Sequence, residues 1–537
     1  MKKKIFALLI AASFGVGGCN EDILENKNQG AYDEGTYFTN AATFNEGVIG
    51  IYSCLLMKGL YSRDAYFLFD LLGNDAVNNV FLLGDLAQLQ DYSFGSSQPQ
   101  VQDLWTNLYR MILRSNLILN KIETWTPALP ADQQKKDQYI AEAQFLRGYG
   151  HFMLVSLWGR VPLKMDYKTA ALDAPRASVE EVWAAVEEDF TAAINGLPVS
   201  YDASNLGRVT KGAAVAMLGK SYLYQKKYAQ AETEFAKLLT TPYTYKLAES
   251  NDQLFVPSGL GKDFENNDLP VSDNGKNPEV IFQVPHGKWQ GWGTGNAFYM
   301  FGGQEAWGGK ATHSGRAQEY GWNDWNNVMV SDALVNAYKY RNEAGQEYID
   351  PRGAVTFYGN APSGGDVTYC DKCSGGAKPY PFGSTNTIRY SWRKYSVYEV
   401  AEKSNLPQSE INTIIVRLAD VKLMLAEAQI YQNKLTDALT QINEVRRRSG
   451  AFEYTTLGGQ PTAIEILRRE RQMELAGEQV RWFDLNRWGI ARQVINAEKQ
   501  AQLGKTPFQD RNALLPIPQL EKDSNPAVAA DVAGDWN

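Results

Sequence analysis

The densest group of chemically distinctive side chains in this sequence is a set of tryptophans among glycines. Five of the 13 tryptophans fall within 37 residues, and nine glycines lie between positions 287 and 315. These tryptophans are Trp289, Trp292, Trp307, Trp322 and Trp325. Indole rings on glycine-rich loops can present flat faces to the C–H faces of sugar rings, while nearby amides and carboxylates bond the hydroxyls. The pattern predicts a carbohydrate-binding surface; the alternative is a small core that covers a loop.

A second stretch, Gly73–Phe94, carries polar side chains of the kind that bind sugar hydroxyls. It contains Asn74, Asp75, Asn78 and Asn79, followed by the aromatic residues Tyr92 and Phe94. These residues precede a helix that is expected around Trp105. The stretch is a second candidate for ligand binding, and the alternative is a polar loop that caps the Trp105 helix.

Sequence motifs that would indicate catalysis are missing. There is no GxSxG nucleophile elbow, no HExxH zinc motif and no EF-hand spacing. Gly303–Lys310 fails as a phosphate-binding loop because Ala311 stands where Ser or Thr must hold magnesium. Gly291–Gly295 lacks the preceding strand and the following helix of a dinucleotide site. With only three histidines, a histidine-rich metal centre is not expected.

Charge and composition narrow the function classes further. The 61 acidic residues offer many carboxylate pairs, so none stands out as the acid and base of a glycoside hydrolase. We therefore expect a protein that is not an enzyme and has no cofactor, with a surface glycoside hydrolase as the less favoured alternative. A formal charge of −8 argues against nucleic-acid binding, which needs a basic surface. The sequence leaves open whether calcium helps to order the loops.

The N-terminus has the layout of a bacterial lipoprotein signal. Met1–Lys4 is basic, Ile5–Phe14 is mostly apolar, and Gly15–Gly18 is small and precedes Cys19. The apolar stretch is too short to span a bilayer. We expect residues 1–18 to be removed and the thiol of Cys19 to carry a lipid that anchors the protein to a membrane. The alternative is an ordinary signal peptide with an incidental cysteine.

Two of the remaining cysteines indicate a local disulfide rather than a metal site. Cys370 and Cys373 form a lone CxxC pair in a loop rich in Gly, Pro and Tyr. A zinc site would need a second pair, and a thioredoxin-type site would need a following helix. In an oxidising exterior a disulfide between them is favoured, with a redox role as the alternative. Cys54 lies in an apolar run and is expected in the core.

Helical periodicity dominates both ends of the chain. Apolar residues recur at helical spacing in Gln98–Glu123, Lys135–Trp158 and Ser178–Asn195, and Ser178 and Glu181 form a capping-box pattern. Thr210–Leu239 fits a tetratricopeptide-type hairpin in which Gly219 lets two helices approach and Tyr222 and Phe235 fill the space between them. Arg417–Arg448 repeats this pattern, and Glu465–Gly477 predicts one more helix. Single hairpins cannot bury their apolar faces, so the hairpins are expected to stack.

The middle of the chain, Pro242–Ser409, is rich in Gly, Asn, Asp, Pro and aromatic residues. Ser331–Arg341 predicts a helix there, and Glu279–Val284 and Ile388–Val397 predict short strands or hairpins. Such a long insertion predicts an ordered, functional loop region. The expected fold is mainly α: a tetratricopeptide-like helical hairpin scaffold with a large irregular loop region and a few short strands. It forms a single domain over residues 19–537, with helical parts at 19–240 and 411–537 and the loop-rich part at 241–410.

The run Leu467–Gly489 is dense in charged and aromatic residues and resembles an anion or catalytic site. Arg468, Arg471, Glu474 and Glu478 fall at spacings that favour ion pairs along a helix. Trp482, Phe483 and Trp488 would pack this segment down. We therefore interpret the run as structural.

Several of these segments together resemble the SusD/RagB family of outer-membrane nutrient-binding lipoproteins of Bacteroidetes. The resemblance covers almost the whole chain and depends on five features in order. They are Cys19, Ala141–Arg147 running into Leu157–Leu163, Arg417–Ala428, Glu470–Gly489 with its Arg481–Leu485 centre, and Leu515–Pro518 with Asn525–Pro526.

The resemblance implies a lipid-anchored protein on the outer face of the cell outer membrane. Family members capture oligosaccharides, or in some cases peptides, and pass them to a SusC-like TonB-dependent transporter; they are not enzymes. By region, the family's sugar-binding positions correspond to Tyr92, Phe94, Trp289, Trp292, Trp307 and Trp322. A peptide-capturing RagB-like protein is the first alternative, and a purely adhesive surface protein is another.

Overall fold

The computed structural model describes twelve segments of the chain. They are residues 34–79, 84–167, 173–202, 205, 207–255, 277–286, 316–360, 368–371, 373, 375–398, 411–500 and 507–531. Cys19 and the tryptophans at 289, 292 and 307 lie outside these segments, so the predictions made for them stay predictions.

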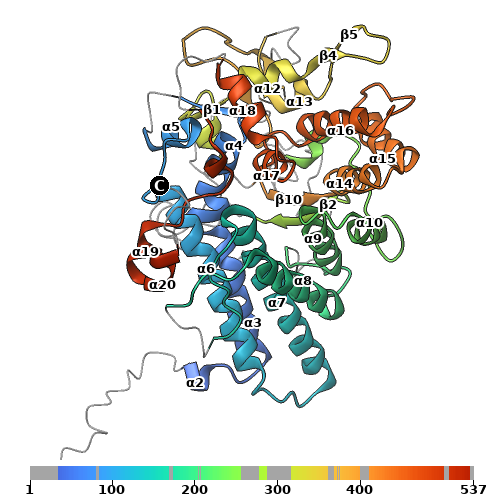
Figure 1. The fold of residues 1–537 in the computed structure, drawn as a ribbon. Helices are drawn as coiled ribbons and strands as arrows, with labels where there is room; N and C mark the ends of the chain where they lie inside the picture. The colour runs from blue at the N-terminus through green and yellow to red at the C-terminus, as the bar shows by residue number, and fades with distance from the viewer. Residues whose placement is uncertain are drawn as a thin grey trace, which may run out of the picture.

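Long helices form the N-terminal part of the described chain (Figure 1). They are α3 (Ala41–Tyr52), α6 (Pro99–Ile122), α7 (Pro130–Trp158), α8 (Val179–Gly196), α9 (Lys211–Tyr224) and α10 (Tyr228–Lys237). The predicted stripe of α6 is buried, with Leu104, Leu108 and Met111 fully enclosed. In α8, Ser178 Oγ accepts from the Glu181 N–H at 3.2 Å, and the Glu181 carboxylate accepts from the Ser178 N–H at 2.8 Å. The capping box is therefore confirmed.

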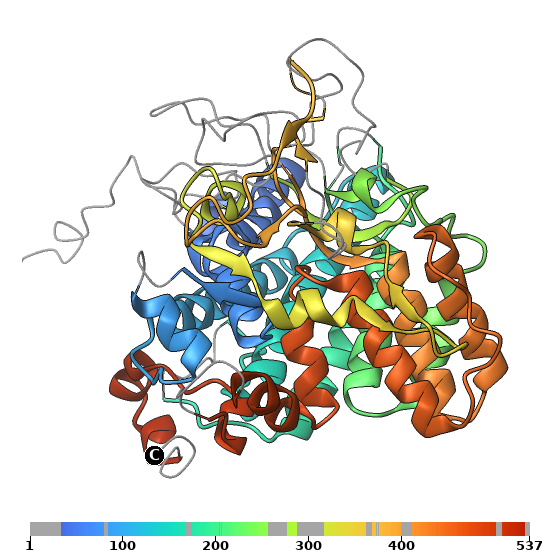
Figure 2. The ribbon, with the colours of Figure 1, turned by 90° about the horizontal axis from the view of Figure 1, so that it is seen from above.

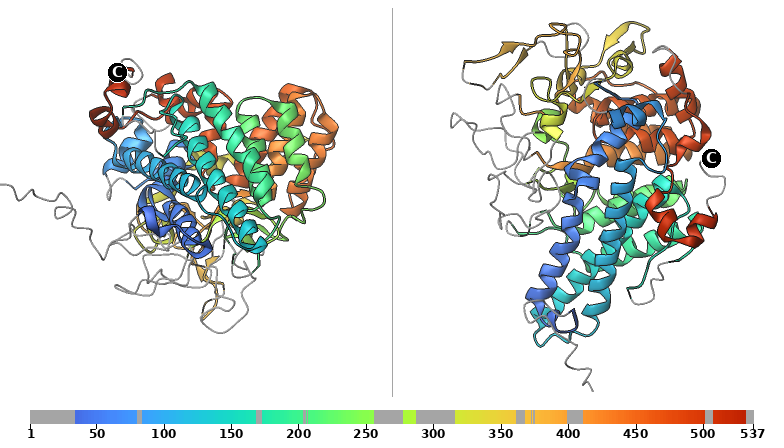
Figure 3. Two further views of the ribbon diagram at one scale, coloured as in Figure 1. Left: turned by 90° about the horizontal axis from the view of Figure 1, so that it is seen from below. Right: turned by 90° about the vertical axis from the view of Figure 1, so that its left-hand side faces the viewer.

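The C-terminal part is also helical. Its helices are α14 (Leu418–Tyr431), α15 (Leu435–Arg448), α16 (Gln460–Leu475), α17 (Arg481–Arg487), α18 (Ala491–Gln500), α19 (Gln519–Ser524) and α20 (Pro526–Asp531). Seen from below, the main helices follow one another from blue α3 through green α9 and α10 to orange α14 and α15 (Figure 3). This arrangement confirms the mainly helical scaffold.

The two predicted hairpins, α9–α10 and α14–α15, are present, and the first differs from the prediction in the position of Tyr222. A Cβ on Gly219 would lie 2.7 Å from the ring of Phe235, so only glycine lets the two helices of the first hairpin approach this closely. Tyr222 is only partly buried and packs against the edge of the core rather than filling its centre. The hairpins stack through Tyr228 and Tyr431, whose parallel rings lie 4.4 Å apart.

Short segments connect and cover these helices. They are α2 (Glu34–Tyr37), η2 (Ser53–Leu56), η3 (Lys58–Ser62), α4 (Asp64–Leu72), α5 (Gly84–Asp91), η5 (Asn251–Leu254), α11 (Arg316–Tyr320), α12 (Asp332–Ala337), α13 (Gly353–Thr356) and η6 (Asp510–Ala513). α5 lies within Gly73–Phe94, where the sequence analysis considered a loop.

Among the described residues, five antiparallel strand pairs lie in or border the central region. They are β1 (Ala76–Asn78) with β3 (Val328–Val330), β2 (Val280–Val284) with β10 (Thr413–Arg417), β4 (Lys339–Arg341) with β5 (Glu347–Ile349), β6 (Phe357–Tyr358) with β9 (Ser391–Trp392), and β7 (Thr368–Tyr369) with β8 (Lys378–Pro379). Seen from above, the yellow and light-orange segments of this region lie across one end of the helical body (Figure 2).

The predicted helix Ser331–Arg341 is wrong in its second half. Ser331 caps α12, but the helix ends at Ala337 and the chain continues as strand β4. Tyr338 marks the change because its hydroxyl is bound in the core, donating to the Met473 carbonyl at 2.9 Å. The predicted strand Ile388–Val397 shrinks to Ser391–Trp392, whereas β2 matches the prediction for Glu279–Val284.

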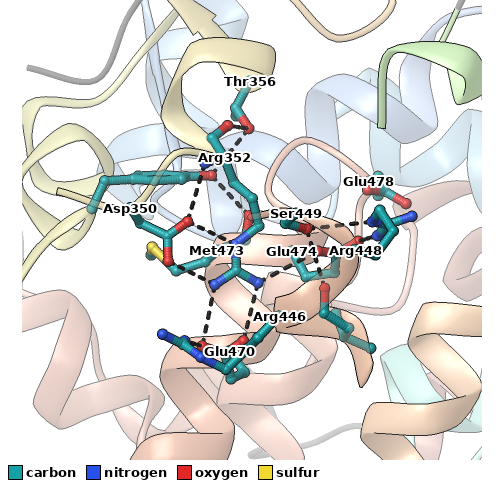
Figure 4. Close-up of polar contacts among 12 residues, drawn as sticks. Asp350, Arg352, Thr356, Arg446, Arg448, Ser449, Glu470, Met473, Glu474 and Glu478 are labelled. Carbon is teal, nitrogen blue, oxygen red and sulfur yellow. Dashed lines mark hydrogen bonds and ion pairs between the residues drawn. The ribbon is translucent and has the colours of Figure 1, made fainter. Parts of the chain in front are cut away.

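A buried network of charged side chains joins the central region to the C-terminal helices (Figure 4). Its five cations and five anions are each at most 5% exposed in their side chains: Arg352, Lys394, Arg417, Arg446, Arg448, Glu279, Asp350, Glu470, Glu474 and Glu478. The charges balance, so the network can be buried without an uncompensated ion.

Arg417 lies at the centre of this network. Its guanidinium donates to Glu279, Glu474 and Glu478, each at 2.7 Å. Burial alone would raise the pKa of Glu474. The nearby guanidinium groups of Arg448, Arg417 and Arg352 nevertheless hold this pKa well below its usual range. The structural interpretation of Leu467–Gly489 is thus supported, but these glutamates pair with distant segments rather than along their own helix.

Candidate ligand-binding site

The turn between α11 and β3, residues 321–327, carries both tryptophans of the glycine-rich region that the structure describes, Trp322 and Trp325. Backbone hydrogen bonds close the turn: Asp324 N–H donates to the Gly321 carbonyl at 3.1 Å, and Asn327 N–H to the Glu319 carbonyl at 2.7 Å. Position 321 needs glycine because a Cβ there would lie 2.5 Å from the Tyr398 hydroxyl. The turn is therefore held in one conformation by its own backbone and by the residues below it.

An aromatic cluster supports this turn from below. Trp322 is 8% exposed, and its ring meets Tyr369, Tyr380 and Tyr398 at centroid distances of 4.9 to 5.3 Å. The Tyr398 hydroxyl donates to the Asp324 carboxylate at 2.5 Å and accepts from the Asn323 N–H at 3.0 Å. Trp322 is thus a supporting residue whose face is covered, and it cannot stack on a sugar without leaving this cluster.

Trp325, three residues further on, is 37% exposed. Of the two tryptophans of this region that the structure describes, it is the one that offers an indole surface to solvent. From the sequence, Trp322 rather than Trp325 is predicted among the binding residues. Both belong to the same glycine-rich cluster, and only burial distinguishes the supporting ring from the exposed one.

The second predicted stretch lies directly beside this turn. Strand β1 pairs with β3 so that Asn78 is opposite Val328, and the Asn79 N–H donates to the Asn327 carbonyl at 2.8 Å. Asn74 and Asn78 are each 7% exposed, and their side-chain nitrogens have no hydrogen-bond partner among the described residues. The structure therefore brings together an exposed indole and an amide-rich strand that are about 250 residues apart in the sequence.

Asp75 lies behind the strand rather than at the surface. It is 3% exposed and accepts from the Gln472 side chain at 3.0 Å. Burial raises the pKa of Asp75 to about 6, although Arg481 at 3.9 Å opposes this shift. Asp75 connects β1 to the C-terminal helices and shapes the site from within.

Tyr92 and Phe94 are core residues in this structure. Each is 3% exposed, and the Tyr92 hydroxyl donates to the Leu72 carbonyl at 2.5 Å. The Tyr92 ring meets Phe508 edge-on at 4.9 Å. Rings buried in this way cannot stack on a ligand without leaving the core, so we do not include them in the site proposed below.

Cys370 and Cys373 form a disulfide, as favoured by the sequence analysis. The bridge lies between β7 and β8, and the Cys370 N–H donates to the Tyr398 carbonyl at 2.7 Å. The loop that this disulfide closes is therefore hydrogen-bonded to the aromatic cluster that supports the Trp325 turn. Cys54 is buried, as expected.

Within the described segments, no group of three or more His, Cys, Asp or Glu side chains is placed to hold a metal ion. None of the described helices is both long enough and apolar enough to cross a bilayer.

Comparison with known sequences finds two family profiles along the chain. The profile described as "SusD family" matches residues 278–530, and the one described as "Starch-binding associating with outer membrane" matches residues 26–223. A SusD-like protein P25 of Formosa agariphila is 24% identical, and the match covers 98% of this chain and 97% of that protein.

Comparison with solved structures confirms the fold. A SusD superfamily protein from Bacteroides vulgatus has a TM-score of 0.74 at 23% identity, covering 92% of this chain and 99% of that one. A laminarin-binding SusD-like protein has a TM-score of 0.68 at 24% identity, covering 91% of this chain and 98% of that one.

Proposed function

Since this chain belongs to the SusD/RagB family, we propose that it is a cell-surface lipoprotein that captures an oligosaccharide and passes it to a SusC-like TonB-dependent transporter. In this proposal Cys19 carries the lipid anchor in the outer membrane. The protein binds its ligand and does not cleave it. The observation that carries the proposal is the Trp325 turn beside strand β1.

The Trp325 turn has the properties that sugar binding requires. An exposed indole supplies an apolar face for the C–H surface of a pyranose ring. The amide nitrogens of Asn74 and Asn78 lack partners in the described structure but are buried, so they can donate to sugar hydroxyls only if these side chains turn outward. Because the aromatic cluster and backbone bonds already hold the turn, little conformational entropy is lost on binding.

A neutral glycan is favoured over a peptide by the chemistry of these groups. Extended peptides are usually captured through main-chain hydrogen bonds to an exposed strand edge. Beside the Trp325 turn, one edge of β1 is instead paired with β3, and the Asn78 N–H on the other edge donates to the Gln90 side chain at 2.8 Å. These main-chain donors are therefore already used. A structural neighbour is named for laminarin binding, which makes laminarin oligosaccharides the first probe to try.

The proposal is tested by calorimetric titration of the purified protein with neutral oligosaccharides, beginning with laminarin oligosaccharides. Replacing Trp325 by Ala is expected to weaken binding by about 2 kcal/mol, the size of an interface hot spot. Trp325→Tyr, which keeps an aromatic face, is expected to retain most of the affinity. Ile349→Ala, which truncates a similarly exposed apolar side chain on β5, serves as the matched control.

Three outcomes would contradict the proposal. Equal affinity in wild type and Trp325→Ala would place the ligand elsewhere. Binding of peptides without binding of any glycan would favour the peptide-capturing alternative. Shortened glycan products, detected by chromatography after the titration, would favour the glycoside hydrolase.

A further inference from the structure

A cavity of about 400 Å³ lies away from the Trp325 turn and shares no residue with it. It is open to solvent on one side and is bordered by residues 199–201 and 207–210 between α8 and α9, by the segment that follows α10, and by strand β2. Tyr243, Tyr245, Arg208, Ser200, Asn277 and Gln283 are among its lining residues, and we call it the Tyr243 cavity. Its volume falls within the range of small-molecule sites, roughly 300 to 1,000 Å³.

Two parallel tyrosine rings form one wall of the Tyr243 cavity. Tyr243 and Tyr245 are separated by one residue, so in an extended chain their side chains lie on the same side. Their rings are 11° from parallel, with centroids 5.9 Å apart, and both are partly exposed. The pair therefore offers flat aromatic surface in the cavity wall, which suits the apolar face of a sugar ring.

The walls are pre-formed rather than loose. The Tyr245 hydroxyl occupies the space beside Gly212 of α9, where a Cβ would lie 2.1 Å away. The Lys246 N–H donates to the Pro278 carbonyl at 3.0 Å and so ties the tyrosine segment to the approach of β2. On β2, Phe282 packs edge-on against Phe145 at 5.2 Å, which fixes the floor. A pre-formed wall lowers the entropy lost when a ligand binds.

The described lining of the cavity carries no uncompensated charge. Arg208 is the one Lys, Arg, Asp, Glu or His among the described lining residues. Its guanidinium donates to both oxygens of the buried Glu142, at 3.0 and 2.9 Å, so its charge is already compensated. Ser200 and Gln283 add a hydroxyl and an amide to the lining. A carboxylate or phosphate would find no uncompensated cation here, whereas a neutral polyhydroxyl ring would find aromatic, hydroxyl and amide partners.

We propose that the Tyr243 cavity is a second carbohydrate site that takes one or two neutral sugar residues, separate from the Trp325 turn. Tyr243 and Tyr245 stack on the ring, and Ser200 and Gln283 bond its hydroxyls. The inference depends on the cavity alone and does not require the Trp325 turn to bind a glycan.

Saturation-transfer NMR with neutral disaccharides tests this site, using laminaribiose, cellobiose, maltose and mannobiose as probes and glucuronate as the anionic comparator. At least one disaccharide is expected to bind the Trp325→Ala protein, and glucuronate is not. Tyr243→Ala is expected to weaken that binding by about five- to tenfold, the loss of one aromatic contact. Ser200→Trp, which adds bulk at an exposed lining residue, is expected to abolish it.

Tyr228→Ala is the matched control because Tyr228 is also partly exposed and stacked on another tyrosine, but lies outside the cavity. It is expected to leave disaccharide binding unchanged. The proposal is overturned if no disaccharide binds the Trp325→Ala protein. It is also overturned if adding Tyr243→Ala or Ser200→Trp to the Trp325→Ala protein leaves its disaccharide affinity unchanged. Loss of oligosaccharide binding in Trp325→Ala, with no effect of the cavity variants, would leave the proposed function standing and remove the second site.

Discussion

Replacing Arg417 by Met is the sharpest test of how the central region is held to the C-terminal helices. Arg417 is 1% exposed and donates to Glu279, Glu474 and Glu478. Methionine fills similar volume but supplies no charge, so these carboxylates lose a cation that they share. Removing one partner from buried ion pairs costs about 3–5 kcal/mol, and we expect a loss of this size in the free energy of unfolding at pH 7.

The loss should shrink at low pH, and the direction follows from Glu478. In the wild-type protein burial would raise the pKa of Glu478, but Arg417 and Lys394 hold it below its usual range. Such a group contributes stability that is present above its unfolded pKa and is lost as the pH falls through its folded pKa. Without Arg417 only Lys394 opposes the effect of burial, so the pKa of folded Glu478 is higher in the variant than in the wild type. The difference in unfolding free energy between wild type and variant is therefore expected to narrow as the pH falls through the range between these two pKa values, which extends below about 4.5.

Urea unfolding followed by circular dichroism measures this gap, because urea adds no salt that would screen the charges. Arg447→Met is the matched control: Arg447 lies on α15 between Arg446 and Arg448 of the network, but its pair with Glu453 is 62% and 41% exposed. Exposed pairs contribute about 0–1 kcal/mol, so this variant is expected to unfold close to wild type. If Arg417→Met and Arg447→Met cost the same, or if the cost of Arg417→Met does not change with pH, the network does not stabilise the fold as argued.

Three further substitutions test the packing of the helices and the pH dependence of stability. Gly219→Ala places a Cβ 2.7 Å from Phe235 and is expected to cost about 1–3 kcal/mol by overpacking, whereas Gly50→Ala has open space within helix α3 and is expected to stabilise by about 0.5–1 kcal/mol. Thermal unfolding distinguishes them, and equal shifts would contradict the packing of the hairpin. Burial raises the pKa of Glu498 to about 7, although Arg481 opposes this shift. Between about pH 4.5 and 7 the folded protein therefore keeps a proton on Glu498 that the unfolded chain releases. The free energy of unfolding should fall as the pH rises through this range. Glu498→Gln is expected to flatten that decline in urea titrations across this range, and an unchanged slope would contradict it.

Local patterns were enough to predict most of the helical scaffold. The periodicity of α6, the capping box of α8 and the glycine-to-phenylalanine contact of the first hairpin depend on residues close in sequence, and all are present in the structure. The strand β2 and the Cys370–Cys373 bridge are local in the same sense. The helix expected over Ser331–Arg341 was wrong beyond Ala337, because the buried hydrogen bond of Tyr338 to Met473 overrides the local preference.

In the candidate site, sequence patterns did not reveal which aromatic side chains are exposed. The composition of the glycine-rich region indicated an aromatic binding surface, but it could not distinguish Trp322 from Trp325. Trp322 is covered by three tyrosines from residues 369–398, while Trp325 is left exposed. The same limit applies to Tyr92 and Phe94, whose burial depends on partners such as Phe508 far along the chain.

By itself the sequence determined the class of protein: a mainly helical hairpin scaffold, an aromatic-rich central region and the motifs of the SusD/RagB family. These properties depend on the spacing and composition of residues, which are fixed by the sequence before any tertiary contact forms. Only the tertiary structure decided which side chains meet. The pairing of β1 with β3, the balanced charge network around Arg417 and the Tyr243 cavity each join segments that lie far apart in the sequence, so their geometry exists only when the whole chain is packed.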